Sequence, residues 1–216
     1  MHDGRPGRPG RFLSGHAEVP TPYGPALVDL ERPAGPARSL LVLGHGAGGG
    51  VDAPDLLAVR RAALAAAVTV ARVTQPYRVR GRRSPAPAGQ LDEAWSHVVA
   101  TLPIDGLPLI VGGRSSGARV ACRTAGALGA AGIVALAFPL HPPGRPDRSR
   151  APELLTGLPT LVVNGDRDPF GVPSSGPGIE VAIRPGERHD LRRDPAAVGA
   201  AVVAWLVRHG WAAASL

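Results

Sequence analysis

The pentapeptide Gly-Arg-Ser-Ser-Gly at residues 113–117 restricts the fold of this chain more than any other stretch. An apolar run at 107–111 precedes it, and a helix-compatible run at 118–128 follows it. Glycine on both sides of the serines allows a strand to turn sharply into a helix. Such a turn lifts the Ser115 hydroxyl out of the sheet edge, next to a helix N-terminus. Ser115 is therefore a candidate nucleophile.

Length and composition favour one folded domain. The chain has 216 residues, of which 44% are hydrophobic, and this is enough for a sizeable core. We expect residues 1–15, which are rich in Gly, Pro and Arg, to form a flexible tail, and residues 16–216 to form a single domain. The single cysteine, Cys122, excludes an internal disulfide. We expect a cytoplasmic protein, because no stretch resembles a secretion signal or a membrane span.

The basic charge is interpreted as a solvated surface. All 24 basic residues are arginine, and the formal net charge is +7. The arginines are scattered, apart from clusters at 5–11 and 78–83. This scatter favours surface solubility over a nucleic-acid interface, so we expect neither a nucleic-acid nor a membrane partner.

Continuous apolar runs predict strands that are buried on both faces. The clearest such run is at residues 40–43, and further strands are predicted at 68–73, 107–111, 133–138, 161–163 and 179–183. An antiparallel pair at 16–18 and 26–30 precedes them, and helical patterns at 54–67, near 91–99, at 118–128 and from Asp194 onward lie between or after them. This alternation predicts an α/β fold with a mostly parallel sheet and helices on both faces. In such sheets, ligands bind at the carboxyl ends of the strands.

Local patterns give further expectations about helices and loops. Asp52 is predicted to cap the first helix, with Pro54 in its first turn. Residues 75–89, rich in Pro and Arg, are predicted to be a loop. Apolar residues at helical spacing predict an amphipathic helix whose inner face consists of Leu91, Trp95, Val98 and Val99.

The residues after the later strands offer partners for Ser115. His189 follows the strand at 179–183 and could take the serine proton. Two carboxylates follow the strand at 161–163. We favour Asp168, which lies further into the loop, as the group that orients His189, whereas Asp166 could hold the turn through backbone N–H groups. The order Ser115, Asp168, His189 matches a serine triad on such a sheet.

The glycine-rich segment 44–50 follows the first buried strand. It is either a flexible turn or a loop that presents N–H groups to an oxyanion. In the second case the N–H groups of Ala47, or a neighbour, and of Ser116 would form the oxyanion hole. His45 and Gly46 are then candidate pocket residues. No Gly-Lys-Ser/Thr ends the segment, which argues against a phosphate loop.

Three further residues lie after strands on the same edge. Arg78 and Arg80 could bind a substrate carboxylate or phosphate, although surface solubility explains them more simply. His141 either lines the pocket or holds a rigid loop. We expect no metal and no cofactor, because the sequence contains no H-E-x-x-H motif, H-x-x-E-H motif or Cys/His cluster.

Several stretches together resemble the α/β-hydrolase superfamily, and more narrowly its small dienelactone-hydrolase-like branch of predicted hydrolases. They are LGHGAG at 43–48, QPYR at 75–78, GGRSSGAR at 112–119, PLHPPG at 139–144, GDRDPFG at 165–171 and HDL at 189–191. The branch is related to the hydrolase-like domain in a subunit of the NSL chromatin complex. The resemblance implies Ser115 as nucleophile, Asp168 as acid and His189 as base. Ser116 departs from the pattern, in which a bulkier or Met-like residue is expected.

These observations predict a cofactor-free serine hydrolase that acts on small soluble esters or thioesters through an acyl-enzyme. The short segment 139–159 between two strands predicts an open cleft without a lid domain. The alternative is a catalytically silent interaction module on a hydrolase scaffold, since a fold does not determine a function. The oligomeric state stays open.

Overall fold

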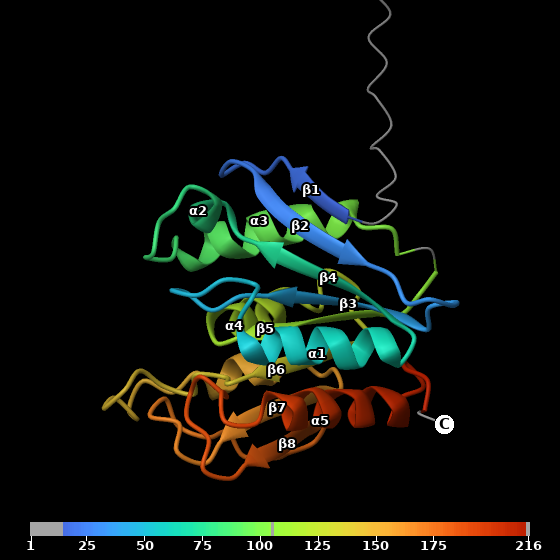
Figure 1. The fold of residues 1–216 in the computed structure, drawn as a ribbon. Helices are drawn as coiled ribbons and strands as arrows, with labels where there is room; N and C mark the ends of the chain where they lie inside the picture. Colours follow the sequence, from blue (N-terminus) through green and yellow to red (C-terminus); the bar gives the residue numbers. More distant parts are fainter. Residues whose placement is uncertain (1–14, 105, 215–216) are drawn as a thin grey trace, which may run out of the picture.

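The polypeptide forms one eight-stranded sheet between two layers of helices (Figure 1). The computed structural model describes residues 15–104 and 106–214. The strand order is β1-β2-β4-β3-β5-β6-β7-β8. The expected tail at residues 1–15 lies outside the described residues except for Gly15, which begins β1.

The strands follow the predicted apolar runs. They are β1 (Gly15–Val19), β2 (Ala26–Glu31), β3 (Ser39–Gly44), β4 (Val68–Thr74), β5 (Leu109–Arg114), β6 (Gly132–Leu136), β7 (Thr160–Gly165) and β8 (Ile179–Arg184). β1 pairs antiparallel with β2, and β2 pairs antiparallel with β4. All pairs from β4 through to β8 are parallel. The prediction of a mostly parallel sheet is therefore confirmed.

The helices form a layer on each face of the sheet. They are α1 (Pro54–Ala65), α2 (Pro76–Val79), α3 (Ala88–Thr101), α4 (Ser116–Thr124), the 3₁₀ helix η1 (Ala151–Leu154) and α5 (Pro195–Arg208). α1 and α5 pack side by side on one face, and α3 and α4 cover the other (Figure 1). Between β6 and β7 the only helix is η1, and this whole segment is described, so no lid domain lies there.

β3 illustrates why the central strands are apolar throughout. Successive side chains of a strand point to opposite faces of the sheet. Leu40 and Val42 pack with α3 and α4, and Leu41 and Leu43 pack with α1 and α5. All four side chains are fully buried. A strand covered by helices on both sides therefore has no polar face, which is why the apolar runs identified the sheet.

The amphipathic pattern of α3 is also confirmed. Leu91, Trp95, Val98 and Val99 are buried on one face of this helix. At the start of α5, the Asp194 carboxylate accepts a hydrogen bond of 3.0 Å from the Ala197 N–H. This side-chain cap explains why α5 begins where an Asp-Pro pair predicted it.

Three local predictions were wrong. Asp52 does not cap α1, because the N-cap residue is Ala53 and the helix has no side-chain cap. The expected loop at 75–89 contains the short helix α2, whose first N–H bonds run to the Gln75 carbonyl. The helix expected at 118–128 is α4, which starts at Ser116 and ends at Thr124. It starts earlier than predicted because the serine turn leads into it without an intervening residue.

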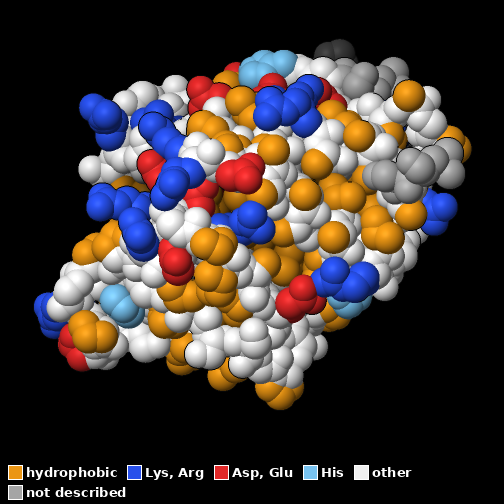
Figure 2. Space-filling view, turned by 60° about the horizontal axis from the view of Figure 1, so that its bottom comes forward, with side chains coloured by type: hydrophobic (Ala, Val, Ile, Leu, Met, Phe, Trp, Pro, Cys, Tyr) orange, Lys and Arg blue, Asp and Glu red, His pale blue; other side chains and the backbone are white. Residues whose placement is uncertain are grey.

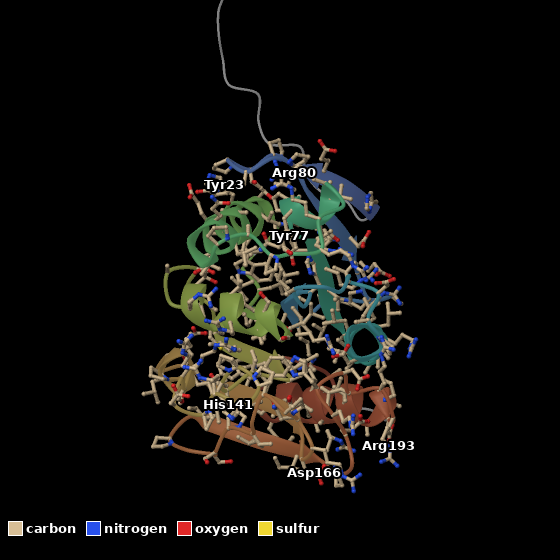
Figure 3. All side chains as sticks on the ribbon, turned by 90° about the vertical axis from the view of Figure 1, so that its left-hand side faces the viewer. Tyr23, Tyr77, Arg80, His141, Asp166 and Arg193 are labelled. Carbon is tan, nitrogen blue, oxygen red and sulfur yellow. The ribbon has the colours of Figure 1, made fainter. Side chains whose placement is uncertain are left out.

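The parallel strands all end at one edge of the sheet, on the left in Figure 1. Figure 3 views that edge, with Tyr77 in its upper half and His141 in its lower half, on the side of β7 and β8. Every candidate site residue belongs to a strand end, loop or helix start at this edge. Within the described ranges, no helix combines the length and the apolarity that a membrane span requires.

Candidate active site

Ser115 occupies a sharp turn between β5 and α4. Its backbone has φ 52° and ψ −109°, in a region that non-glycine residues rarely adopt. A Cβ added to Gly113 or Gly117 would lie 2.5 Å from the Gly44 carbonyl oxygen. The Ser115 N–H donates to the Leu136 carbonyl at 2.9 Å. The two glycines thus let the turn pack directly against the end of β3, and this packing presents the Ser115 side chain at the sheet edge.

Replacing Gly117 by Ala is expected to destabilise the fold by about 3 kcal/mol, because the new methyl group would overlap backbone atoms of β3. The clash is with the Gly44 oxygen and carbon at 2.5 and 2.6 Å. Gly126 is the matched control, since nothing lies within 4 Å of a Cβ added there. Denaturant unfolding followed by circular dichroism measures both variants. Equal stability of the two variants would contradict this account of the turn.

Ser115, His189 and Asp168 lie in one chain of hydrogen bonds. His189 Nε2 is 2.9 Å from Ser115 Oγ, and His189 Nδ1 is 2.8 Å from Asp168 Oδ2. A neutral His189 that carries its proton on Nδ1 donates to the carboxylate and accepts from the serine hydroxyl. The Asp168 side chain is fully buried, while the His189 side chain is 19% exposed. This arrangement can activate a serine and leaves the histidine in reach of a ligand.

The loop after β7 fixes the Asp168 carboxylate. Its Oδ1 accepts from the Phe170 N–H at 2.8 Å, and its Oδ2 lies 3.3 Å from Asn164 Nδ2. Asn164 is fully buried and also accepts from the Phe138 N–H at 2.8 Å. These bonds hold one carboxylate oxygen toward His189.

Asp166 has a different place. Its Oδ1 accepts from the Gly186 N–H at 2.7 Å, on the exposed side of the loop. Figure 3 shows Asp166 at the β8 end of the molecule, close to Arg193. Of the two carboxylates that the sequence offered, Asp168 is therefore the one that contacts His189.

Phe170 and Asn164 contact the site but did not stand out in the sequence. The Phe170 ring packs on the His189 ring with centroids 4.1 Å apart and planes at 31°. Asn164 reaches Asp168 from the end of β7. In the sequence, both residues are marked only by their position in or next to the loop that contains Asp168. Both side chains restrict how His189 and Asp168 can move.

The glycine-rich loop after β3 borders Ser115. A Cβ added to Gly46 would lie 3.7 Å from the Ser115 Cβ. The Tyr77 hydroxyl donates to the Ala47 carbonyl at 2.7 Å and anchors the loop. No hydrogen bond joins the Ala47 N–H to any residue that the structure describes. Ser116 is the first residue of α4, where a helix leaves its N–H groups without internal partners.

His45 lies beneath this loop rather than on the cleft wall, which corrects its expected place in the pocket. It is only 3% exposed. Its Nδ1 is 2.8 Å from the Gly46 carbonyl, and its Nε2 accepts from the Gln75 N–H at 3.1 Å. Burial lowers the pKa of His45, although the bond to Gly46 opposes this shift. A neutral His45 therefore ties the loop to the end of β4.

His141 makes its contacts within its own loop and the neighbouring loop that holds Asp168. Its ring Nδ1 is 2.8 Å from the Pro142 carbonyl, and its backbone N–H donates to the Phe170 carbonyl at 2.9 Å. The ring packs so closely that a Cβ added to Gly171 would lie 2.5 Å from Nε2. These contacts match the rigid-loop interpretation of His141. The ring braces the loop that holds Asp168.

Two hollows meet at the loop that contains His189. One, of about 470 Å³, is lined by Arg167, Pro169, Arg188, His189 and Asp190. The other, of about 340 Å³, lies between this loop, the glycine-rich loop and the start of α1, and shares Asp190 with the first. Figure 2, in which the strands again end on the left, shows acidic and basic side chains gathered on that side. The site is therefore open and rich in charge.

Arg78 and Arg80 diverge in the structure. Arg78 lines the hollow of about 340 Å³ together with Arg114 and Arg192. Arg80 is exposed and faces a separate hollow of about 480 Å³ next to Tyr77. Figure 3 shows Arg80 near Tyr23, on the opposite side of the edge from His141. Of these two arginines, Arg78 is the one that lines a hollow next to the His189 loop and the glycine-rich loop.

The remaining reactive side chains do not form a second site among the described residues. Burial raises the pKa of the Cys122 thiol to about 12, so this thiol is inert at neutral pH. Across residues 15–104 and 106–214, no three His, Cys, Asp or Glu side chains are grouped as metal ligands. The hydrogen-bonded chain at Ser115 is consequently the arrangement with the clearest chemical capacity.

A family model described as an alpha/beta hydrolase domain matches residues 37–182, more than half of the chain. The chain belongs to the alpha/beta-hydrolase family. The match covers the strands from β3 to β7 and the serine turn. No curated protein matches the sequence.

Solved structures of alpha/beta hydrolases share this architecture. An α/β serine hydrolase without lid from Xanthomonas campestris is 20% identical, with a TM-score of 0.72 over 98% of this chain and 100% of that chain. Est1E from Butyrivibrio proteoclasticus is 15% identical, with a TM-score of 0.72 over 90% and 98%. A dienelactone hydrolase from Anabaena variabilis is 18% identical, with a TM-score of 0.69 over 89% and 96%. The predicted fold and its likeness to dienelactone hydrolases are thus confirmed.

Proposed function

We propose that this alpha/beta hydrolase cleaves small, soluble esters or thioesters with Ser115 as nucleophile, His189 as base and Asp168 as the group that orients His189. The observation that carries the proposal is the hydrogen-bonded chain from Ser115 Oγ through both nitrogens of His189 to Asp168 Oδ2. A serine at the turn can form an acyl-enzyme, whereas the Asp168 carboxylate faces the histidine rather than a substrate.

The first half of the reaction forms the acyl-enzyme. Ser115 Oγ bonds to the substrate carbonyl carbon while its proton passes to His189 Nε2, and the carbonyl oxygen becomes an oxyanion. Two backbone donors, the N–H groups of Ala47 and Ser116, would stabilise this oxyanion. The bond to the leaving oxygen or sulfur then breaks, and the leaving group takes the proton from His189. Asp168 stabilises the transient imidazolium throughout.

The second half regenerates the serine. A water molecule gives a proton to His189 Nε2 as its oxygen bonds to the acyl carbon. The second tetrahedral intermediate collapses, the acid leaves, and Ser115 recovers its proton from His189. Each step uses the same two contacts, at 2.9 Å and 2.8 Å. Apart from the substrate and one water molecule, the scheme uses only groups of the polypeptide.

The open site supports small, soluble substrates. The hollow of about 470 Å³ reaches His189 directly, and no lid domain lies between β6 and β7. The charged side chains of Arg167, Arg188 and Asp190 line that hollow next to His189, which favours small, polar substrates over a long acyl chain. Assays with short-chain esters of p-nitrophenol and short-chain thioesters of thiophenol test this preference for small substrates. Turnover confined to long-chain lipids would overturn it.

Replacing Asp168 by Asn is expected to lower kcat about 10⁴-fold, because the amide cannot hold the His189 tautomer in which Nδ1 bears the proton. The matched control is Asp166→Asn, which changes a carboxylate in the same loop that contacts the Gly186 N–H instead. We expect this control to keep kcat within about threefold. Initial rates with p-nitrophenyl acetate measure both variants. A larger loss in the Asp166 variant would reverse the two assignments.

A further inference from the structure

Arg114, the residue directly before Ser115, has a mostly buried side chain whose guanidinium reaches two other elements. Its side chain is 15% exposed. Its Nη2 donates to the backbone carbonyl of His189 at 2.9 Å. Its Nε lies 3.0 Å from Asp55 Oδ2, at the start of α1. One side chain therefore links the serine turn to the base and to a buried carboxylate.

Asp55 gives this link a fixed end. Its side chain is fully buried, and its Oδ1 accepts from the Leu56 N–H at 3.0 Å. Burial raises the pKa of Asp55, and Arg114 opposes that shift. The two side chains form an ion pair whose Nε and Oδ2 atoms are not aligned as a hydrogen bond. A buried carboxylate is costly unless a cation faces it, so this pairing keeps the guanidinium of Arg114 next to Asp55.

The guanidinium also lies under the glycine-rich loop. A Cβ added to Gly46 would be 3.1 Å from Arg114 Nη1 and 3.7 Å from the Ser115 Cβ. A side chain at position 46 would crowd the guanidinium, so glycine lets the loop lie close to Arg114. Arg114 thus contacts the loop that holds Ala47 and the loop that holds His189, and it adjoins Ser115 in the chain.

We propose that Arg114, anchored by Asp55, is a positioning residue that sets the His189 loop and the glycine-rich loop relative to Ser115. The inference rests on the proposed function for its rate effects. The direct neighbours of His189, Arg188 and Asp190, are exposed, whereas the next residues on either side, Glu187 and Leu191, are buried. Arg114 donates to the backbone carbonyl of His189, the proposed base. A displacement of the base by about 1 Å would lower the rate about 100-fold.

The role needs the shape of arginine as well as its charge. The planar guanidinium presents nitrogen atoms to the His189 carbonyl and to Asp55 at the same time. A lysine ammonium is a single point charge and cannot reproduce both contacts with one geometry. We therefore expect Arg114→Lys to retain the charge and still lose rate, whereas a purely electrostatic role would survive that change.

The decisive test separates positioning from stability. Arg114→Met leaves Asp55 buried and unpaired, so both the melting temperature and kcat should fall. The double variant Asp55→Leu/Arg114→Met replaces the pair by apolar groups and should recover the melting temperature. Its kcat should stay about 10- to 100-fold below wild type, with KM changed by less than about threefold. Recovery of kcat together with the melting temperature would overturn the proposal.

Arg119 supplies a matched control. It is a part-buried arginine of α4 that pairs with Glu153 at 2.8 Å. Arg119→Met should lower the melting temperature and leave kcat within about threefold of wild type. A loss of kcat equal to that of the double variant would show that any broken ion pair slows the enzyme, which would refute the special role of Arg114.

Hydrogen exchange provides a readout that does not depend on catalysis. In the double variant, backbone amides of residues 188–191 should exchange faster than in wild type, with exchange in the central strands unchanged. Unchanged exchange of this loop would overturn the positioning role. If wild type hydrolyses no ester or thioester, the proposed function fails, while faster exchange of the loop still supports the inference.

Discussion

Replacing Ser115 by Ala is expected to lower kcat for p-nitrophenyl acetate by about 10⁶-fold, because it removes the hydroxyl that would form the acyl-enzyme. His189 Nε2 lies 2.9 Å from Ser115 Oγ, and removal of that oxygen leaves the base without a group to activate. The fold should tolerate the change, since the Ser115 side chain is partly exposed and lies at the sheet edge. Steady-state rates and a thermal melt of the same preparation measure the two effects.

Ser116 is the matched control for Ser115. It is the adjacent serine and contributes to the proposed mechanism only through its backbone N–H, which an alanine retains. Ser116→Ala should therefore keep kcat within about tenfold of wild type. If Ser116→Ala abolishes turnover and Ser115→Ala does not, the nucleophile has been assigned to the wrong serine.

Replacing His189 by Ala is expected to reduce kcat by a similar factor, about 10⁵- to 10⁶-fold. The imidazole contacts both Ser115 and Asp168 and so links the two side chains. Without it, no base accepts the serine proton, and no acid donates to the leaving group. Pre-steady-state assays should detect neither a burst of product nor an accumulated acyl-enzyme in this variant.

His141 offers the comparison for His189. Its Nδ1 faces the Pro142 carbonyl and its ring packs against Gly171, so its contacts stay within the loops. His141→Ala should lower the melting temperature and reduce kcat by less than about tenfold. A loss that matches His189→Ala would mean that His141 takes part in proton transfer.

Strand-end reasoning explains how much of the site could be predicted from the sequence. In a parallel sheet, every carboxyl end lies at one edge, so residues after successive strands meet even when the sequence separates them. Ser115 and His189 are 74 positions apart and still contact each other. Apolar runs such as 40–43 located the strands because both of their faces are covered.

Roles that depend on exact distances could not be predicted in the same way. The sequence pattern around Ser115 indicates no role for Arg114. Its contacts with Asp55 and the His189 carbonyl form only when three elements pack together. His45 read as a pocket residue because it follows a strand, but its ring turns beneath the loop and is buried. A sequence pattern indicates which edge a residue lies at, whereas side-chain direction depends on packing.

Labelling with a fluorophosphonate tests the central claim most directly. The probe bonds covalently to an activated serine oxygen, and peptide mass spectrometry locates the adduct. We predict a single adduct on Ser115 in wild type, which disappears in Ser115→Ala and falls strongly in His189→Ala. A folded wild-type protein that takes up no probe, or that is labelled at another serine, would contradict the account.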